Sequence, residues 1–268
     1  MLSRTQKQLI IGGIYILIAL IIAGGGYWAK FSPTCSDNKQ NGKEEGVDCG
    51  TLACGQACAA PVQALLIQTP QLIKTPVGDF DLAFGVYNPN INYGAEAVFY
   101  DLIITDPDGK EVLRRANNFY ILQGQTKYVI QTSLRNIPDN STASVEVKSV
   151  TWEKVVTTDK VNFIVTREAI TPSANQTTYE AVVMNDSNFD FETLDINVVV
   201  LDNSGKVVAT NMTNLQTLLS HTERSVKVSW PFKLPEGVRI QIEVGTNVFN
   251  NTNFLKQNGS QEKFQQYF

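Results

Sequence analysis

The chain has 268 residues, a net charge of −4 and a sequence pI near 5.1. This acidic balance argues against a nucleic-acid partner, because the sequence contains no basic block longer than the Arg114-Arg115 pair. A single histidine, His221, and no cysteine outside one short segment leave few groups for acid–base or thiol catalysis. We therefore expect no catalytic residues and no enzymatic activity.

An apolar segment lies near the N-terminus. Residues 9–29 contain no Asp, Glu, Lys or Arg, and as a helix they would span about 31 Å, close to the thickness of the bilayer hydrocarbon. The segment is longer than the apolar region of a cleaved signal peptide, and no Ala-x-Ala site closes it. We expect an uncleaved transmembrane signal anchor at residues 9–29, in contact with the lipid bilayer.

The flanking charges predict the orientation of this segment. Arg4 and Lys7 precede it, and short basic flanks of this kind stay in the cytoplasm. Lysines also follow the segment, but they are mixed with acidic residues and the first flank usually dominates. We expect residues 1–8 in the cytoplasm and the bulk of a single-pass membrane protein in the extracellular or periplasmic space.

The next segment, residues 30–61, contains all four cysteines: Cys35, Cys49, Cys54 and Cys58. An even number of cysteines beside an export signal is typical of disulfide bonds. A four-cysteine zinc site is the alternative, although the spacing lacks the paired C-x2-C units of such sites. We expect two disulfides in a juxtamembrane loop, with all three pairings open.

Oxygen ligands are frequent between the first two cysteines. Asp37, Asn41, Glu45 and Asp48 supply carboxylate or amide oxygens, and Ca²⁺ takes about six to eight oxygen ligands. The spacing differs from that of an EF-hand loop. Two interpretations therefore stay open, namely a calcium site at these four residues and a solvated acidic loop held by disulfides.

The sequence from Cys35 to Cys58 resembles a short motif, C-x-D-G-x-x-N-G-x-E-x-G-x-D-C-G-G-x-C-x-x-C, of bacterial exported and membrane-anchored proteins. The residues in register with it include Asp37, Asn41, Glu44, Asp48 and Cys49. The chain departs from the motif where Asn38 replaces its first glycine and where residues 51–53 lengthen its closing part. The resemblance implies a module beside the membrane and no particular activity.

Beyond residue 61 the composition changes to Val, Ile, Thr, Phe and Tyr, punctuated by Asn, Asp, Gly and Pro, which is typical of an all-β region. Apolar and polar residues alternate in four segments: 80–86, 194–200, 226–230 and 238–244. This alternation predicts half-buried strands with one face in the core and one face in water.

An internal repeat runs through the β region. The segment Val86-Tyr-Asn-Pro-Asn90 is echoed by Val183-Met-Asn-Asp-Ser-Asn188, and the hairpin signal Asp106-x-x-Gly-Lys returns 96 residues later at Asp202 (202 − 106 = 96). A period of this size suits an immunoglobulin-type sandwich of about 100 residues. We expect two tandem immunoglobulin-like β-sandwich domains, at residues 62–157 and 158–254, and a flexible tail at residues 255–268.

The two copies resemble the immunoglobulin-like domains of the FxLYD and late-embryogenesis-abundant groups. In those domains a strand ending in V-x-N-x-N is followed by a long strand and a D-x-x-G-K hairpin, as it is twice in residues 62–254. The resemblance implies an accessory module that is exported or tethered to a membrane and has no catalytic residues.

Together these features predict non-enzymatic binding or scaffolding at the cell envelope, with another envelope protein or a surface ligand as the partner. One alternative is a structural subunit of a membrane or surface assembly, because Gly12-Gly13 and the glycines at 24–26 permit close packing of helices. A further alternative is a calcium-responsive envelope module. No cofactor other than calcium is expected.

Overall fold

The computed structural model describes residues 4–31, 35–56, 58, 62–154 and 161–258. The protein is 52% strand and 15% helix, which confirms the expected predominance of β structure beside one N-terminal apolar helix. The chain divides into two compact units, residues 1–61 and 62–268.

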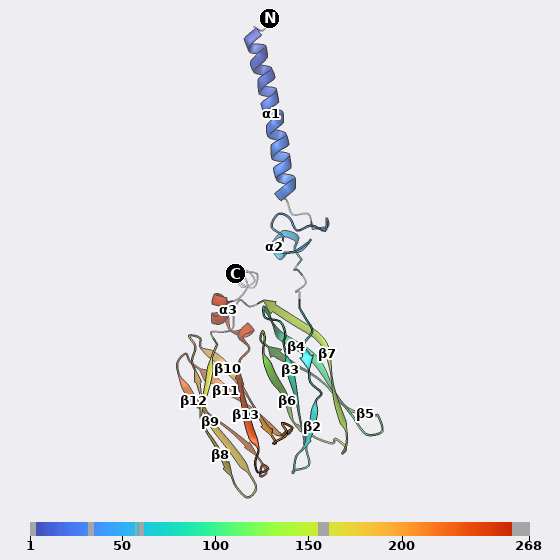
Figure 1. The fold of residues 1–268 in the computed structure, drawn as a ribbon, viewed down its shortest axis with the longest axis vertical. Coiled ribbons are helices and arrows are strands. Elements are labelled where there is room, and N and C mark those ends of the chain that lie inside the picture. Colours follow the sequence, from blue (N-terminus) through green and yellow to red (C-terminus); the bar gives the residue numbers. More distant parts are fainter. Residues whose placement is uncertain (1–3, 32–34, 57, 59–61, 155–160, 259–268) are drawn as a thin grey trace. The chain divides into compact units, whose positions relative to one another are not determined.

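The smaller unit contains helix α1 (Arg4–Phe31) and the short helix α2 (Thr51–Cys54), both labelled in Figure 1. Within α1, residues 8–28 form a stretch of 21 residues with a mean hydropathy of 2.4. A helix of this length and composition is able to cross a membrane, as a membrane anchor or a signal sequence does. The acidic first turn that many soluble helices show is absent from α1.

The larger unit consists of two groups of strands. The first strand group comprises β1 (Leu66–Ile67), β2 (Gln71–Lys74), β3 (Phe80–Tyr87), β4 (Tyr93–Thr105), β5 (Glu111–Ile121), β6 (Thr126–Leu134) and β7 (Thr142–Lys154). The second strand group comprises β8 (Phe163–Pro172), β9 (Thr177–Asn185), β10 (Phe191–Leu201), β11 (Val207–Leu218), β12 (Glu223–Trp230) and β13 (Arg239–Gly245). The short helices η1 (Val248–Asn250) and α3 (Thr252–Asn258) follow β13, so α3 includes the first residues of the predicted tail.

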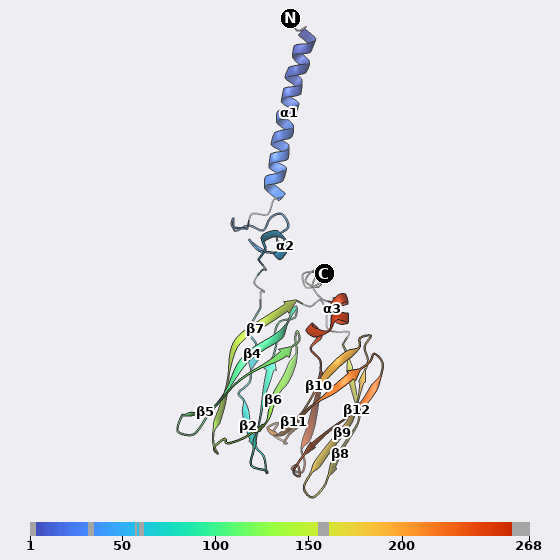
Figure 2. The ribbon, with the colours of Figure 1, turned by 180° about the vertical axis from the view of Figure 1, so that it is seen from behind.

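The same antiparallel pairing pattern occurs in both strand groups. In the first group β3 pairs with β6 on one side and with β1 and β2 on the other, and β4 pairs with β5 and β7. In the second group β9 pairs with β12 and β8, and β10 pairs with β11 and β13. Figure 2 shows the strands of both groups from behind.

Each strand group encloses its own apolar core. In the first group, Leu82 and Phe84 of β3 pack in one cluster with Leu102 and Ile104 of β4. In the second group, the corresponding cluster joins the sheet of β9 to that of β10 and contains the fully buried Trp230. Each cluster therefore draws on both sheets of its group.

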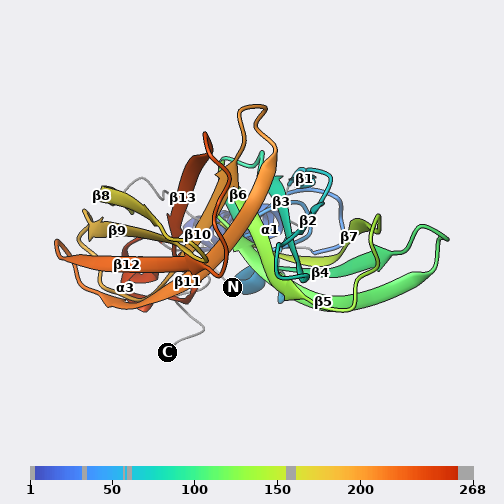
Figure 3. The same ribbon diagram turned by 90° about the horizontal axis from the view of Figure 1, so that it is seen from below.

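A third apolar cluster, here called the seam, joins the two strand groups. It consists of six buried residues with Tyr128 packed against them: Ile73, Ala83, Ile130, Val199, Leu201 and Val207. Figure 3 shows β3 and β6 beside β10 and β11. Two hydrogen bonds cross at Tyr128, whose N–H donates to the Glu243 carboxylate (2.8 Å) and whose carbonyl accepts from the Asn197 amide (3.1 Å).

The seam corrects the prediction of half-buried strands at 80–86 and 194–200. Both segments are strands, but both faces of each strand are buried. Ala83 and Val199 lie in the seam, while the residues next to them in the strand lie in the cores. Asp81, which alternation assigned to the solvent face, is only 6% exposed and accepts a hydrogen bond from the Ser133 N–H (2.9 Å).

The repeated sequence elements make the same contacts in both groups. The Asn88 amide donates to the carbonyls of Tyr93 (2.8 Å) and Leu122 (2.9 Å). The Asn185 amide donates to the carbonyls of Phe189 (2.7 Å) and Leu218 (3.3 Å). Both asparagines are 0% exposed, so each side chain satisfies backbone carbonyls at one end of its core.

The two Asp-x-x-Gly-Lys hairpins are also alike. The carboxylate of Asp106 accepts from the N–H of Lys110 (2.9 Å), and that of Asp202 accepts from the N–H of Lys206 (3.0 Å). Both turn glycines have a φ of 82°, a left-handed value that a side chain would strain.

We predict that Asn185→Ala lowers the free energy of unfolding by about 2–4 kcal/mol, because it leaves two buried carbonyls without a donor. Asn214→Ala, at an exposed position of β11, is the matched control and should change it by less than about 0.5 kcal/mol. Denaturant unfolding of both variants measures the difference. Equal losses would show that the buried amide contributes nothing specific.

Candidate functional site

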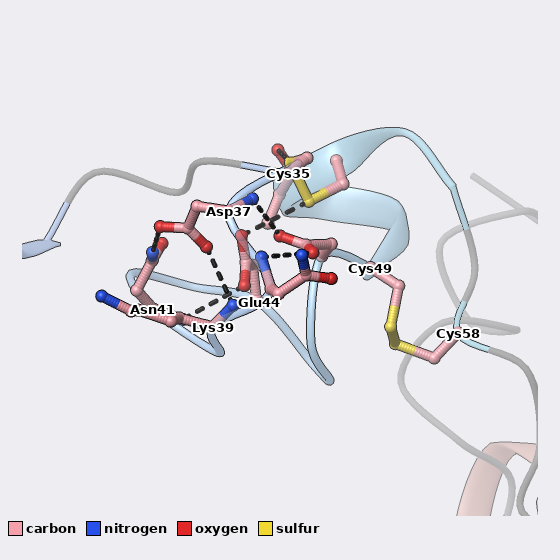
Figure 4. The surroundings of a disulfide bond; sticks show 11 residues. Cys35, Asp37, Lys39, Asn41, Glu44, Cys49 and Cys58 are labelled. Carbon is pink, nitrogen blue, oxygen red and sulfur yellow. Dashed lines mark hydrogen bonds between the residues drawn. A yellow bond between two sulfur atoms is a disulfide. The ribbon is translucent and has the colours of Figure 1, made fainter.

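The cysteine-rich segment forms a small module held by two disulfides. Cys35 is bonded to Cys54 and Cys49 to Cys58, and no described cysteine is free (Figure 4). The two disulfides expected from the sequence are thus present, with one of the three possible pairings. A zinc ion needs thiolate ligands, and sulfur atoms joined in disulfides do not supply them.

Two glycines of this module allow its chain segments to approach closely. A Cβ atom at Gly46 would lie 2.9 Å from the Sγ atoms of both Cys49 and Cys58. At Gly50, where φ is 136°, a Cβ would lie 2.9 Å from the backbone nitrogen of Glu45. Any side chain at either position would therefore displace backbone or a disulfide.

The carboxylates of the module bind its own backbone N–H groups. Asp48 accepts from the N–H groups of Asp37 (2.8 Å) and Asn38 (2.7 Å), and Glu44 accepts from the N–H of Asn41 (3.1 Å). The Asn41 amide in turn donates to the Asp37 carboxylate (2.9 Å), as Figure 4 shows. These contacts involve Asp37, Asn41, Glu44 and Asp48, all in register with the motif, so the first role of these side chains is to hold the loop.

The predicted calcium ligands are therefore partly engaged. Asp37, Asn41 and Asp48 join one hydrogen-bond network, and Glu45 lies at the surface of the same loop. Among the described residues, the one group of three or more His, Cys, Asp or Glu side chains with ligand atoms within 4.8 Å of one another is Cys35, Glu44 and Cys54, which includes none of the four predicted ligands. Calcium binding stays a prediction that melting with and without Ca²⁺ tests.

His221 lies in the turn between β11 and β12, with a left-handed φ of 55°. Its Nε2 is 3.0 Å from the amide oxygen of Asn188. The neighbouring Ser220 hydroxyl donates to the carbonyl of Ser187 (2.6 Å) and not to the imidazole. The histidine thus ties two turns together, and the absence of catalysis stays a prediction.

Sequence reasoning missed a group of buried charges beside the seam. Lys127 of β6 is 8% exposed, its Nζ donates to the carbonyl of Tyr120 (3.1 Å), and it lies 3.9 Å from the centre of that ring. Burial lowers the pKa of Lys127 to about 8, against the opposing effect of Asp195 and Glu243. Burial also raises the pKa of Glu243. A lysine between polar neighbours in an amphipathic strand carries no sequence signal of this burial.

We predict that the purified full-length chain, without reduction, has lost four hydrogens, two for each disulfide, and that alkylating agents leave it unmodified. Replacing Cys35 and Cys54 together by serine removes one whole disulfide and should expose no thiol. Replacing Cys35 and Cys49 together breaks both disulfides and should leave two thiols that alkylate. Mass spectrometry distinguishes these outcomes, and the reverse pattern would contradict the pairing.

We predict that the free energy of unfolding rises with pH between about 8 and 9.5. In this range the unfolded chain keeps the Lys127 proton while the folded chain releases it, so each pH unit adds at most about 1.4 kcal/mol. Lys127→Met should remove this slope in denaturant unfolding, whereas the exposed control Lys227→Met should keep it. The same slope in both variants would contradict the assignment.

Comparisons with known proteins assign no family. No protein-family model matches the chain, and no curated protein matches it. The crystal structure of red sea bream transglutaminase is similar with a TM-score of 0.23 and 10% identity, over 72% of this chain and 30% of that chain. The crystal structure of Parabacteroides merdae β-glucuronidase is similar with a TM-score of 0.21 and 10% identity, over 70% of this chain and 31% of that chain. The chain spans less than a third of the length of both, and likenesses this distant carry no argument.

Proposed function

We propose that this chain is a non-enzymatic, membrane-anchored protein that binds or scaffolds other envelope components outside the cytoplasm. The observation that carries the proposal is the pair of disulfides that follows a helix able to cross a membrane. Disulfides persist in oxidising compartments, and an apolar helix before them supplies the route of export.

In this proposal α1 is an uncleaved anchor with its N-terminus in the cytoplasm. The basic residues Arg4 and Lys7 at its start support that orientation. The aromatic residues Tyr27 and Trp28 near its other end support a membrane–water interface there. Both rings are exposed, as is typical of aromatic side chains that lie at the level of the lipid headgroups.

The two strand groups are proposed to be tandem immunoglobulin-like sandwiches. The recurring strand pairings, the two buried asparagines and the two equal hairpins support this assignment. The pairing of β3 with β6 and of β4 with β7 corresponds to the B–E and C–F pairs of an immunoglobulin sandwich. Such domains present loops and sheet faces for binding.

A second candidate is a subunit of a membrane or surface assembly. At each of the five glycines of α1 an added Cβ would meet no atom within 4 Å. These positions let another helix approach closely, which favours association in lipid. Self-association of the anchor separates this candidate from a monomeric scaffold.

We predict that a membrane-impermeant maleimide labels Asn214→Cys on intact spheroplasts, because this exposed position of β11 lies outside the cytoplasm in the proposal. The matched variant Ser3→Cys should be labelled only after the membrane is permeabilised. The native cysteines stay unreactive because they are bonded in pairs. Labelling of Ser3→Cys alone would reverse the topology, and labelling of both variants would indicate that α1 does not span the membrane.

A further inference from the structure

Strand β7 lies at the edge of its sheet. It pairs with β4 on one side, and no described strand pairs with its other side. Figures 1 and 2 show it at the margin of the first strand group, away from the second group. In the proposed immunoglobulin-like assignment β7 takes the place of strand F, and no described strand takes the place of strand G beside it. An edge of this kind presents backbone N–H and C=O groups to solvent.

The middle of this edge is open to a partner. Residues 146–149 are exposed, and no hydrogen bond among the described residues reaches the backbone of residues 143–150 from the free side. Val147 is 38% exposed, although Val145 and Val150 of the same strand pack against the core. A strand laid along β7 would pair with the free backbone groups and cover Val147.

Comparable edges of the second strand group are engaged within the chain. β11 is the edge of its sheet, and the Arg224 guanidinium donates to its carbonyls at Gln216 and Thr217. β13 pairs with β10 as β7 pairs with β4, and its Glu243 accepts the N–H of Tyr128 from the first strand group. Residues 143–150 of β7 have no contact of this kind among the described residues, so their edge is available to a separate molecule.

The charges around Val147 are complementary to a second copy of the same strand. Glu146 and Lys148 flank Val147, form an ion pair on one face of the sheet (2.8 Å), and keep 54% and 45% of their side chains exposed. When two β7 strands pair antiparallel with Val147 at the centre, residues at equal distances before and after the centre face each other. Each Glu146 then lies opposite the partner's Lys148. Such pairs of opposite charge stabilise a sheet, and like charges destabilise it.

The same features disfavour an unrelated strand as the partner. The register between β4 and β7 shifts between Phe99 and Tyr100, so Lys148 has no partner residue in β4. A bulge and an exposed lysine are devices by which edge strands avoid random pairing. A partner overcomes them when it places a carboxylate opposite Lys148 and a cation opposite Glu146, and a second β7 does both.

We propose that the free edge of β7 pairs with β7 of a second copy of this chain, antiparallel and with Val147 opposite the partner's Val147. The two sheets then join into one continuous sheet, and the ion pairs between the chains form on one of its faces. This self-association goes beyond the proposed binding function, because it names a second copy as a partner, and it does not depend on the orientation of α1.

The test is disulfide cross-linking of the full-length chain in a non-ionic detergent, where the native cysteines stay bonded in pairs. Val147→Cys places two thiols at the centre of the pairing, where facing Cα atoms are about 4.5–5.5 Å apart, within reach of a disulfide. Mild oxidation should yield a covalent dimer on a non-reducing gel. Ser149→Cys, at an exposed position of the same strand, is the matched control. Its two thiols would lie about 13 Å apart along the paired strands and should not bond.

Charge reversal in the Val147→Cys chain tests the contacts between the copies. Glu146→Lys or Lys148→Glu alone sets like charges opposite each other and should slow cross-linking about tenfold. Both substitutions together restore opposite charges and should return the rate to within about twofold of the starting value. Each rate is divided by the rate of the same chain with a small disulfide, which corrects for thiol reactivity. The control Lys227→Glu disrupts a similar surface ion pair with Glu180 (2.8 Å) and should leave the rate unchanged.

Absence of a Val147→Cys dimer at chain concentrations up to about 100 μM overturns the proposal. Equal cross-linking of Val147→Cys and Ser149→Cys also overturns it, because the chains then meet by collision or through α1 and not in the proposed register. Failure of the double charge reversal to restore the rate is the third contradicting result. These failures are distinct from failure of the proposed function, which the topology labelling detects whether or not the chains pair.

Discussion

The apolar seam between the two strand groups is the contact on which the larger unit depends. β3 and β10 are the central strands of their sheets, and each buries one face in its own core and the other in the seam. Separation of the groups would expose the second faces of both strands to water, at about 25 cal/mol for each Å² of apolar surface. The cores and the seam therefore stabilise one another.

Packing at the seam also buries the charged side chains of Glu243 and Lys127, which therefore need hydrogen-bond partners. Glu243 accepts the N–H of Tyr128, and Lys127 donates to the carbonyl of Tyr120, because buried charges without partners are strongly destabilising. The bond between Tyr128 and Glu243 crosses from one strand group to the other, so it favours one alignment of the groups over others that would bury the same apolar area. The same alignment brings Tyr120 of β5 beside Asp195 of β10.

The cysteine-rich module is stabilised by different means. The segment from Cys35 to Cys58 is too short to bury a sizeable apolar core, so two disulfides restrict its unfolded states instead. Asp48 and Glu44 then satisfy N–H groups that no regular secondary structure pairs. The acidic residues that suggest an ion in the sequence thus have a structural role in the loop, and this role is local to the module.

The sequence by itself determined the features that depend on neighbouring residues: the apolar helix, the strand segments, the Asp-x-x-Gly-Lys hairpins and the number of disulfides. The spacing of the cysteines and carboxylates also predicted the disulfide-bonded loop at residues 30–61. Only the tertiary structure decided which cysteines pair, why Asp81 is buried, and how Tyr120 of one strand group meets Asp195 of the other. Alternation reports which side chains share a face of a strand, but burial of that face depends on which distant segment packs against it, and this information is not local in the chain.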